Sequence, residues 1–278
     1  MKENVMCYFH NDMDGIASAS IVKKVYPNAK FQAVDYGDDW DASDIINSKC
    51  IIVDFSFDNM EELKQYPDIL CWIDHHKSAM EKNKELWDSD EIDGLRDITK
   101  SGCELTWDWF FPHEKVPRAI ELIGDRDMWK FKYGDETRAF HEFVSSRYKE
   151  PNIDLLNLKI DSFMDEFTTE DIGRMLLEKK REQINKSFEQ GTDIKFHSHK
   201  TRLINTNLNV SGVGEYCYKD KGYPIALIWS KRGDKIVCSL RSNTIDVGKI
   251  AESHGGGGHK FASGFTLANF KELEKITK

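Results

Sequence analysis

The sequence predicts an α/β protein with an N-terminal doubly wound parallel-sheet domain and a smaller C-terminal α/β domain, joined by a helical connector. The chain has 278 residues, and at roughly 150 residues per domain this length corresponds to two domains. Short apolar runs alternate with helical patterns in the N-terminal half. From Thr192 onward, 14 Lys and Arg stand against 8 Asp and Glu, so this part carries +6 and the preceding part −15 of the overall −9.

The N-terminal elements follow from the spacing of the apolar residues. Short apolar runs predict strands at residues 5–9, 31–34, 50–53 and 69–73. Apolar residues at helical spacing predict helices at residues 16–26, 59–65, 102–111 and 116–123. Strands that alternate with helices pair in parallel, because each helix returns the chain to the same end of the sheet.

A long polar helix at residues 169–190 is predicted to connect the two domains. The predicted divisions are therefore residues 1–168, the connector at 169–191, and residues 192–278. In the last part, strands are predicted at residues 201–205, 224–230, 235–241 and 261–266, with a helix at 247–254.

The composition excludes several classes of protein. Hydrophobic residues make up 40% and charged residues 31%, which is typical of a globular chain. No apolar run approaches the roughly 20 residues of a membrane span, so no membrane partner is expected. The six cysteines stand singly, which favours reduced thiols and a cytoplasmic location. The net charge of −9 disfavours a long non-specific footprint on nucleic acid.

Acidic and histidine side chains follow three of the predicted strands, at the point where each strand ends. They are His10, Asp12 and Asp14 after the first, Asp54 after the third, and Asp74, His75 and His76 after the fourth. The carboxyl ends of parallel strands share one edge of a sheet, so these residues are predicted to meet. Crowded ionised carboxylates need a counter-charge, and a pair of divalent metal ions supplies it. Taken singly, Asp14 also fits a helix N-cap and Asp54 a turn residue.

The order and spacing of these motifs resemble the DHH phosphoesterase superfamily, whose naming triplet stands here as Asp74-His75-His76. The first motif is matched by residues 10–15, the second by Val53-Asp54, and the fourth by residues 124–127. Residues 239–242 and 255–264 resemble the DHHA1 module of that superfamily. The resemblance spans nearly the whole chain and implies a DHH domain followed by a DHHA1 domain.

This resemblance implies two divalent metal ions, Mn²⁺ being preferred and Mg²⁺ or Co²⁺ remaining open. One ion takes His10, Asp12 and Asp54, and the other takes Asp14, Asp54, His75 and Asp125. His10 departs from the nanoRNase pattern, because it stands in H-x-D-x-D rather than H-x-x-x-D-x-D. In the fourth motif Asp125 and Asp127 compete, and Asp125 is favoured because Asp127 can pair locally with Arg126.

The resemblance also implies catalytic and substrate-binding roles. Asp54 bridges the ions, His76 faces the phosphate, and Asp74 orients a neighbouring imidazole. A water shared by the two ions is the implied nucleophile. In the DHHA1 module, the implied substrate-binding residues are Arg241, Gly255, Gly256, Gly257, Gly258 and His259. The glycines would form a loop whose N–H groups receive a phosphate; a flexible linker is the alternative.

The implied function is a Mn²⁺-dependent phosphodiesterase that hydrolyses short RNA or DNA oligonucleotides, dinucleotides included, as NrnA-like nanoRNase (oligoribonuclease) members do. The alternatives are a soluble hydrolase of cyclic dinucleotides or of 3'-phosphoadenosine 5'-phosphate, a RecJ-like single-strand exonuclease, and a non-catalytic scaffold. Intact acids and histidines at every motif disfavour the scaffold. The sequence leaves open RNA or DNA preference, cleavage polarity and oligomeric state, a homodimer included.

Overall fold

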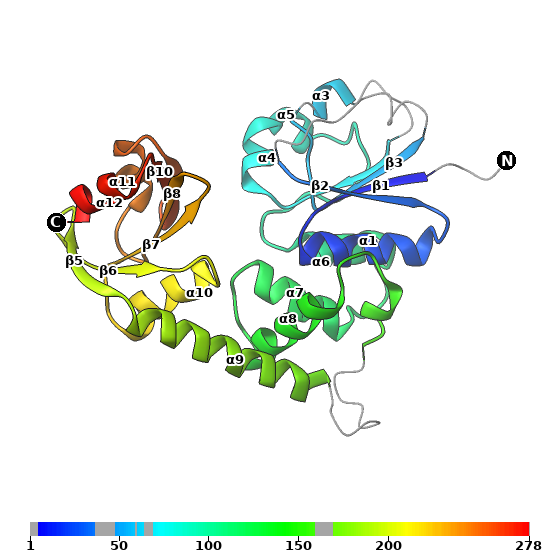
Figure 1. Ribbon diagram of the computed structural model, residues 1–278. Helices are drawn as coiled ribbons and strands as arrows, with labels where there is room; N and C mark the ends of the chain where they lie inside the picture. Colours follow the sequence, from blue (N-terminus) through cyan, green and yellow to red (C-terminus); the bar gives the residue numbers. More distant parts are fainter. Residues whose placement is uncertain (1–4, 37–47, 59, 64–68, 159–168, 278) are drawn as a thin grey trace. The chain divides into compact units, whose positions relative to one another are not determined.

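The computed structural model describes residues 5–36, 48–58, 60–63, 69–158 and 169–277 (Figure 1). The chain divides into two compact units, Met1–Leu177 and Glu178–Lys278. The division falls inside helix α9 (Thr169–Glu189), the long polar helix that the sequence predicts as a connector. No helix within the described ranges is both long enough and apolar enough to cross a membrane.

The first unit contains a four-stranded sheet. Its strands are β1 (Val5–His10), β2 (Lys30–Val34), β3 (Lys49–Val53) and β4 (Ile69–Ile73). They lie in the order β2-β1-β3-β4, and every neighbouring pair is parallel. The strand order therefore reverses between β1 and β3, and open α/β sheets bind their ligands outside the carboxyl ends of strands at such a point.

Helices cover both faces of this sheet (Figure 1). One face packs against α1 (Met13–Val25) and α6 (Gly102–Phe110); α7 (Arg118–Asp127) packs against these two helices, and α8 (Asp135–Arg147) packs against α7. The other face packs against α3 (Met60–Leu63), α4 (Lys77–Lys82) and α5 (Lys84–Trp87). A short 3-10 helix, Ile153–Leu155, precedes α9. Because both faces are covered, neighbouring residues such as Ile51 and Ile52 enter different cores, and the strands appear in the sequence as short continuous apolar runs.

The second unit contains a six-stranded sheet. Its strands are β5 (Thr192–Phe196), β6 (His199–Asn205), β7 (Ile225–Arg232), β8 (Lys235–Arg241), β9 (Gly257–His259) and β10 (Ala262–Leu267). They lie in the order β5-β6-β7-β8-β10-β9, with β6 and β7 parallel and the other neighbours antiparallel. The helical segments of this unit are α10 (Val210–Glu215), a π-helical turn (Tyr216–Asp220), α11 (Val247–Ser253) and α12 (Phe270–Thr277).

The predicted fold class is confirmed: a parallel sheet lies in the N-terminal part, and a second sheet lies in the C-terminal part. Several elements differ from the sequence prediction. Strand β5 and helices α8 and α12 were not predicted, because their many polar residues hide the apolar spacing. The predicted helix at 116–123 continues to Asp127 as α7. The glycine run, predicted as a loop, ends in the edge strand β9, and the predicted helix at 59–65 lies partly outside the described residues.

Candidate metal centre

The turn from β1 to α1 places the first group of acids at the edge of the sheet. Asp12 is the N-cap of α1, because its Oδ1 accepts a hydrogen bond of 2.9 Å from the backbone N–H of Gly15. Gly15 is needed here, since a Cβ atom would lie 1.9 Å from the carbonyl oxygen of His10. The cap is therefore Asp12, and Asp14 lies in the first helical turn.

The carboxylate of Asp14 is buried against the N-terminus of α6. It accepts hydrogen bonds from the backbone N–H groups of Gly102 at 2.7 Å and Cys103 at 3.0 Å. The N-terminus of a helix attracts negatively charged groups, so this contact holds the side chain of Asp14 in place. A Cβ atom on Gly102 would lie 2.4 Å from Oδ1 of Asp54, and glycine therefore lets the helix approach both carboxylates.

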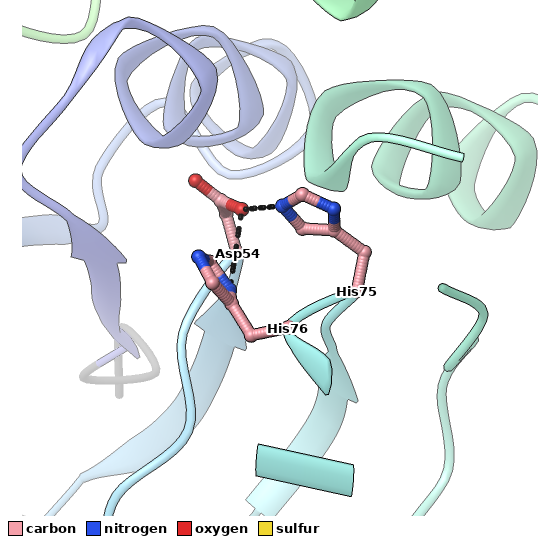
Figure 2. A group of neighbouring side chains, drawn as sticks. All are labelled: Asp54, His75 and His76. Atoms are coloured by element: carbon pink, nitrogen blue, oxygen red, sulfur yellow. Dashed lines mark ion pairs between the residues drawn. The ribbon is translucent and has the colours of Figure 1, made fainter. Parts of the chain in front are cut away.

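Asp54 lies at the centre of the site, directly after β3, and its side chain is fully buried. Its φ of 55° is in the left-handed region, which aspartate and asparagine tolerate better than most residues. Oδ1 lies 3.1 Å from Nε2 of His75 and 4.0 Å from Nδ1 of His76, while Oδ2 lies 4.0 Å from Nδ1 of His10. Figure 2 shows the carboxylate of Asp54 facing the rings of His75 and His76.

Asp74 is buried beneath the histidine pair and fixes the ring of His76. Its Oδ1 lies 2.8 Å from Nδ1 of His76 and accepts the backbone N–H of His75 at 2.7 Å. Its Oδ2 accepts a hydrogen bond from Oγ of Ser56, which in turn accepts one of 2.9 Å from Nε1 of Trp72. The orienting role of Asp74 in catalysis stays a prediction, and these contacts are the ones it would use. Sequence reasoning missed Ser56, because no motif distinguishes this serine from a surface serine.

The structure brings Asp127, and not Asp125, to the acidic cluster. Oδ2 of Asp127 lies 3.5 Å from Nε2 of His75. The carboxylate of Asp125 is turned away and accepts hydrogen bonds from Thr137 Oγ1 at 2.5 Å and Lys132 N at 2.8 Å. The preference for Asp125 is thus corrected, for a physical reason: both residues lie on α7, and two positions at about 100° per residue face nearly opposite sides of a helix.

Among the residues that the structure describes, three groups of side chains have potential ligand atoms within 4.8 Å of one another. They are His10 with Asp12 and Asp54, Asp14 with His75 and Asp127, and Asp54 with His75 and His76. Within the described residues, the buried side-chain polar atoms that lack a hydrogen bond are Nδ1 of His10 and both carboxylate oxygens of Asp54. Buried acceptors that face one another without donors are the arrangement that a cation satisfies, so these residues fit a metal centre.

The pKa values of these groups reflect the crowding of negative charge. Burial, together with the charges of Asp14, Asp12 and Asp127, raises the pKa of Asp54 well above its ordinary value. Burial and the charges of Asp14 and Asp12 raise the pKa of Asp127 to about 8. Burial lowers the pKa of His75, which leaves its imidazole neutral and able to ligate a metal. A divalent cation relieves the repulsion that raises the two aspartate pKa values.

An aromatic wall borders the cluster beside His10 and His76. The ring of Tyr36, 45% exposed, has its centroid 5.4 Å from that of His10, 5.6 Å from that of His76 and 4.9 Å from that of Phe55. Burial and the charges of Asp74 and Asp54 raise its pKa, so the phenol stays protonated and can donate a hydrogen bond. The sequence reading did not identify Tyr36, because it stands alone between β2 and a polar stretch.

The predicted substrate-binding residues of the second unit lie together on the sheet. Arg241 on β8 pairs with Ala262 on β10, which pairs with His259 on β9. Directly paired residues of antiparallel strands present their side chains on the same face, so Arg241 and His259 flank Ala262. Nη1 of Arg241 donates to the carbonyl oxygen of Leu240 at 2.9 Å, which fixes the guanidinium close to the sheet.

The four glycines that precede His259 are not equivalent. A Cβ atom would lie 2.1 Å from the backbone of β10 at Gly256 and 2.6 Å from it at Gly258, whose φ is 134°. Gly255 has a φ of 74°. At these three positions the backbone conformation or the close packing therefore requires glycine. Gly257 has neither a positive φ nor a described atom within 4 Å of such a Cβ, so its lack of a side chain keeps the surface above it open.

The sequence matches two family models that together cover most of the chain. The model of the DHH family, N-terminal domain, matches residues 4–123, and that of the DHHA1 domain matches residues 199–278. The chain therefore contains a DHH N-terminal domain and a DHHA1 domain. Members of the DHH family are metal-dependent phosphoesterases, in agreement with the acids and histidines gathered around Asp54.

The chain is similar to several individual proteins over most of its length. The chain is 28% identical over 247 residues to the uncharacterized protein R106 of Acanthamoeba polyphaga mimivirus; the match covers 82% of this chain but 55% of that relative, so the chain spans about half of its length. It is 24% identical over 298 residues to the oligoribonuclease NrnB of Bacillus subtilis (strain 168), covering 94% and 72%. The solved structure of PggH, a pGpG-specific phosphodiesterase from Vibrio cholerae, aligns over 98% of this chain and 97% of that one, with a TM-score of 0.51 and 12% identity, which shows a common fold.

Proposed function

We propose that this DHH protein is a phosphodiesterase that cleaves short oligonucleotides, dinucleotides included, to mononucleotides with the help of two divalent metal ions. The observation that carries the proposal is the carboxylate of Asp54, fully buried, without a hydrogen-bond donor among the described residues, and faced by further acids and histidines. The names of two similar proteins, an oligoribonuclease and a pGpG-specific phosphodiesterase, support a short nucleotide substrate.

The residues fall into two ligand sets that share Asp54. His10, Asp12 and Asp54 would hold one ion, and Asp14, Asp54, His75 and Asp127 the other. This proposal keeps the predicted sets and replaces Asp125 by Asp127. Mixed carboxylate and imidazole ligands suit Mn²⁺, with Mg²⁺ or Co²⁺ as the alternatives. When bound, such an ion pair supplies a nucleophile at neutral pH and neutralises charge that develops on the phosphate.

His76 is proposed to donate a proton to the phosphate. Burial lowers its pKa, but the hydrogen bond and charge of Asp74 outweigh this effect and raise it, so the imidazolium form is favoured. Because Asp74 occupies Nδ1, Nε2 is the nitrogen that remains for a phosphate oxygen. Asp74 therefore sets both the orientation of the ring and the atom that carries the available proton.

We propose that the second unit binds a phosphate of the substrate through Arg241, the glycine segment Gly255–Gly258 and His259. The guanidinium offers a bidentate contact, and the open surface over Gly257 lets a phosphate approach the backbone. The chain is acidic overall, at −9, and its positive excess lies in the C-terminal part. Such a protein neutralises few phosphates, which favours a short substrate over a long strand.

A substrate panel in Mn²⁺ tests the proposed function. We expect kcat/KM to be highest for dinucleotides and to fall for a 24-residue RNA, with weak or no turnover of cyclic dinucleotides, 3'-phosphoadenosine 5'-phosphate and pyrophosphate. Asp54→Asn is the inactive control. Faster, processive degradation of the 24-residue RNA would point to a RecJ-like exonuclease, and preference for another member of the panel would reassign the substrate.

A variant separates substrate binding from metal chemistry. Arg241→Ala should lower kcat/KM on a dinucleotide strongly and on bis-p-nitrophenyl phosphate only weakly, because the ester lacks a second phosphate. Lys260→Ala, next to His259 but outside the proposed set, is the matched control. Equal losses on both compounds would assign Arg241 to folding.

A further inference from the structure

A strained aromatic loop follows the metal centre directly. Helix α7 ends at Asp127, and the chain continues through Trp129 and Phe131, whose φ values are 55° and 48°. Bulky residues rarely adopt this left-handed region, and such strain persists only where the surrounding structure enforces it. A loop without a special role would relax into an ordinary turn or carry glycine at these two positions.

Asp125 is the residue that enforces the strain. Five groups donate hydrogen bonds to its carbonyl oxygen and carboxylate: Lys130 N at 3.0 Å, Phe131 N at 3.3 Å, Lys132 N at 2.8 Å, Tyr133 N at 3.4 Å and Thr137 Oγ1 at 2.5 Å. Burial opposes ionisation of this carboxyl, but the bonds from Thr137 and the backbone outweigh burial and lower its pKa. Asp125 therefore organises this loop. This role accounts for an aspartate that lies two residues from Asp127 but directs its carboxylate away from the metal centre.

The loop presents an indole to solvent beside the metal centre. The side chain of Trp129 is 43% exposed, although tryptophan is one of the residues with most to gain from burial. The guanidinium carbon of Arg126 lies 4.1 Å from the centroid of Trp129, and the ring of Phe131 packs edge-on at 5.1 Å. Arg138 lies over the ring of Phe131 at 3.9 Å. These contacts hold the indole in place while a large part of its surface stays accessible.

We propose that Trp129, supported by Arg126 and Phe131, is the stacking platform for the nucleobase next to the scissile phosphate. Trp129 follows the cluster residue Asp127 by two positions, and two residues span at most about 7 Å, so the backbone that carries the indole begins at the metal centre. An exposed aromatic ring combined with guanidinium groups matches a ligand that has a flat π face and an adjacent negative phosphate. This inference rests on the proposed function and adds to it a subsite that recognises the base.

The test compares substrates with and without a base. Base–aromatic stacking corresponds to about a 5- to 150-fold change in binding. We therefore expect Trp129→Ala to lower kcat/KM for a dinucleotide by this factor and to leave kcat/KM nearly unchanged for the abasic analogue, which keeps the phosphodiester and both riboses. Trp129→Phe should retain most of the activity. Ile153→Ala, which removes a comparably exposed apolar side chain of the same unit, is the matched control.

A binding measurement keeps this inference separate from the catalytic proposal. Adenosine 5'-monophosphate, titrated into the full chain in EDTA, should quench tryptophan fluorescence in the wild type and in Ile153→Ala but not in Trp129→Phe. If no oligonucleotide is hydrolysed but this quenching is seen, the proposed function fails and the platform stands. Equal losses of kcat/KM on the normal and abasic dinucleotides, or quenching that persists in Trp129→Phe, would overturn the platform. Unchanged kinetics and unchanged binding in the Trp129 variants would also overturn it, and contact with another protein would then be the role of the exposed indole.

Discussion

Replacing Asp54 by asparagine should stabilise the metal-free protein while abolishing its response to metal. Asparagine keeps the shape of the side chain and tolerates the left-handed backbone at this position, so the change removes charge and little else. Neither oxygen of Asp54 accepts a hydrogen bond from the described residues. The substitution therefore costs few favourable contacts and removes a buried like-charge repulsion.

The size of the gain follows from two estimates. Ligand atoms of Asp54 and Asp12 lie within 4.8 Å of each other, and two like charges at that distance repel by about 3.5 kcal/mol at an effective dielectric constant of about 20. The folded protein can avoid this repulsion by protonating the Asp54 carboxyl. For a group with the ordinary aspartate pKa, protonation costs about 4 kcal/mol at pH 7 and about 1.5 kcal/mol at pH 5. Because His10 partly offsets the charge of Asp12, we expect a gain of about 2.5 kcal/mol at pH 7 and about 1 kcal/mol at pH 5.

The direction of the pH dependence is fixed by the raised pKa of Asp54. The folded state binds this proton more tightly than the unfolded state, so the contribution of Asp54 to wild-type stability is greatest at low pH and decreases as the pH rises above the ordinary aspartate range. The asparagine variant lacks this group. Its advantage over the wild type in EDTA should therefore grow from pH 5 to pH 7.

Thermal unfolding in EDTA and in Mn²⁺ measures both effects. At roughly 3 °C per kcal/mol for a unit of this size, Asp54→Asn should raise Tm in EDTA at pH 7 by about 8 °C. Saturating Mn²⁺ should raise the Tm of the wild type and leave that of the variant unchanged. Asp154→Asn, at an exposed position of the same unit, should change neither value. A variant less stable than the wild type in EDTA would mean that the histidines hold Asp54 as a structural anion, and the physical basis for a metal centre would be lost.

Three further predictions follow from the structure. Asp127→Asn should weaken Mn²⁺ binding by about 10- to 100-fold in a metal titration. Asp125→Asn should keep the metal affinity but lower Tm, because it weakens the hydrogen bonds that hold the Trp129 loop. The opposite result would restore Asp125 as the ligand. Gly257→Ala should fold with an unchanged circular dichroism spectrum and Tm but raise KM for dinucleotides, and an unchanged KM would show that substrate does not approach this backbone. Nε2 of His254 lies 3.0 Å from Nε2 of His197, and burial together with His197 lowers the pKa of His254. Protonation of His254 therefore disfavours the folded state. Tm of the second unit should fall as the pH decreases from 7 to 5, and it should fall less in His254→Asn.

Much of the site could be predicted because its residues are placed by short-range rules. The acids and histidines follow strands in sequence, and the ends of parallel strands share an edge, so the approach of His10, Asp54 and His75 required only the correct strands and their parallel pairing. The strands were visible because a sheet buried on both faces leaves continuous apolar runs. The fold class and the DHH and DHHA1 domains were confirmed on this basis.

The residues that were missed depend on contacts between distant segments. Ser56 lies under Asp74 because β3 and β4 are neighbours, and Tyr36 reaches His10 because β2 pairs with β1. Neither serine nor tyrosine carries a pattern that reports such a neighbour. Likewise, the polar strand β5 exists because it pairs with β6, and not because its own residues favour a strand.

The choice between Asp125 and Asp127 shows where sequence information ended. The resemblance to the DHH superfamily implied that an acid of the fourth motif is a metal ligand, but both candidates have the same chemistry. Only the tertiary structure decided between them: α7 continues through both residues, so its rotation turns Asp127 toward His75 and Asp125 toward Thr137. Which face of a helix meets a site depends on how that helix packs against its neighbours, and that packing is set by the whole core of the unit.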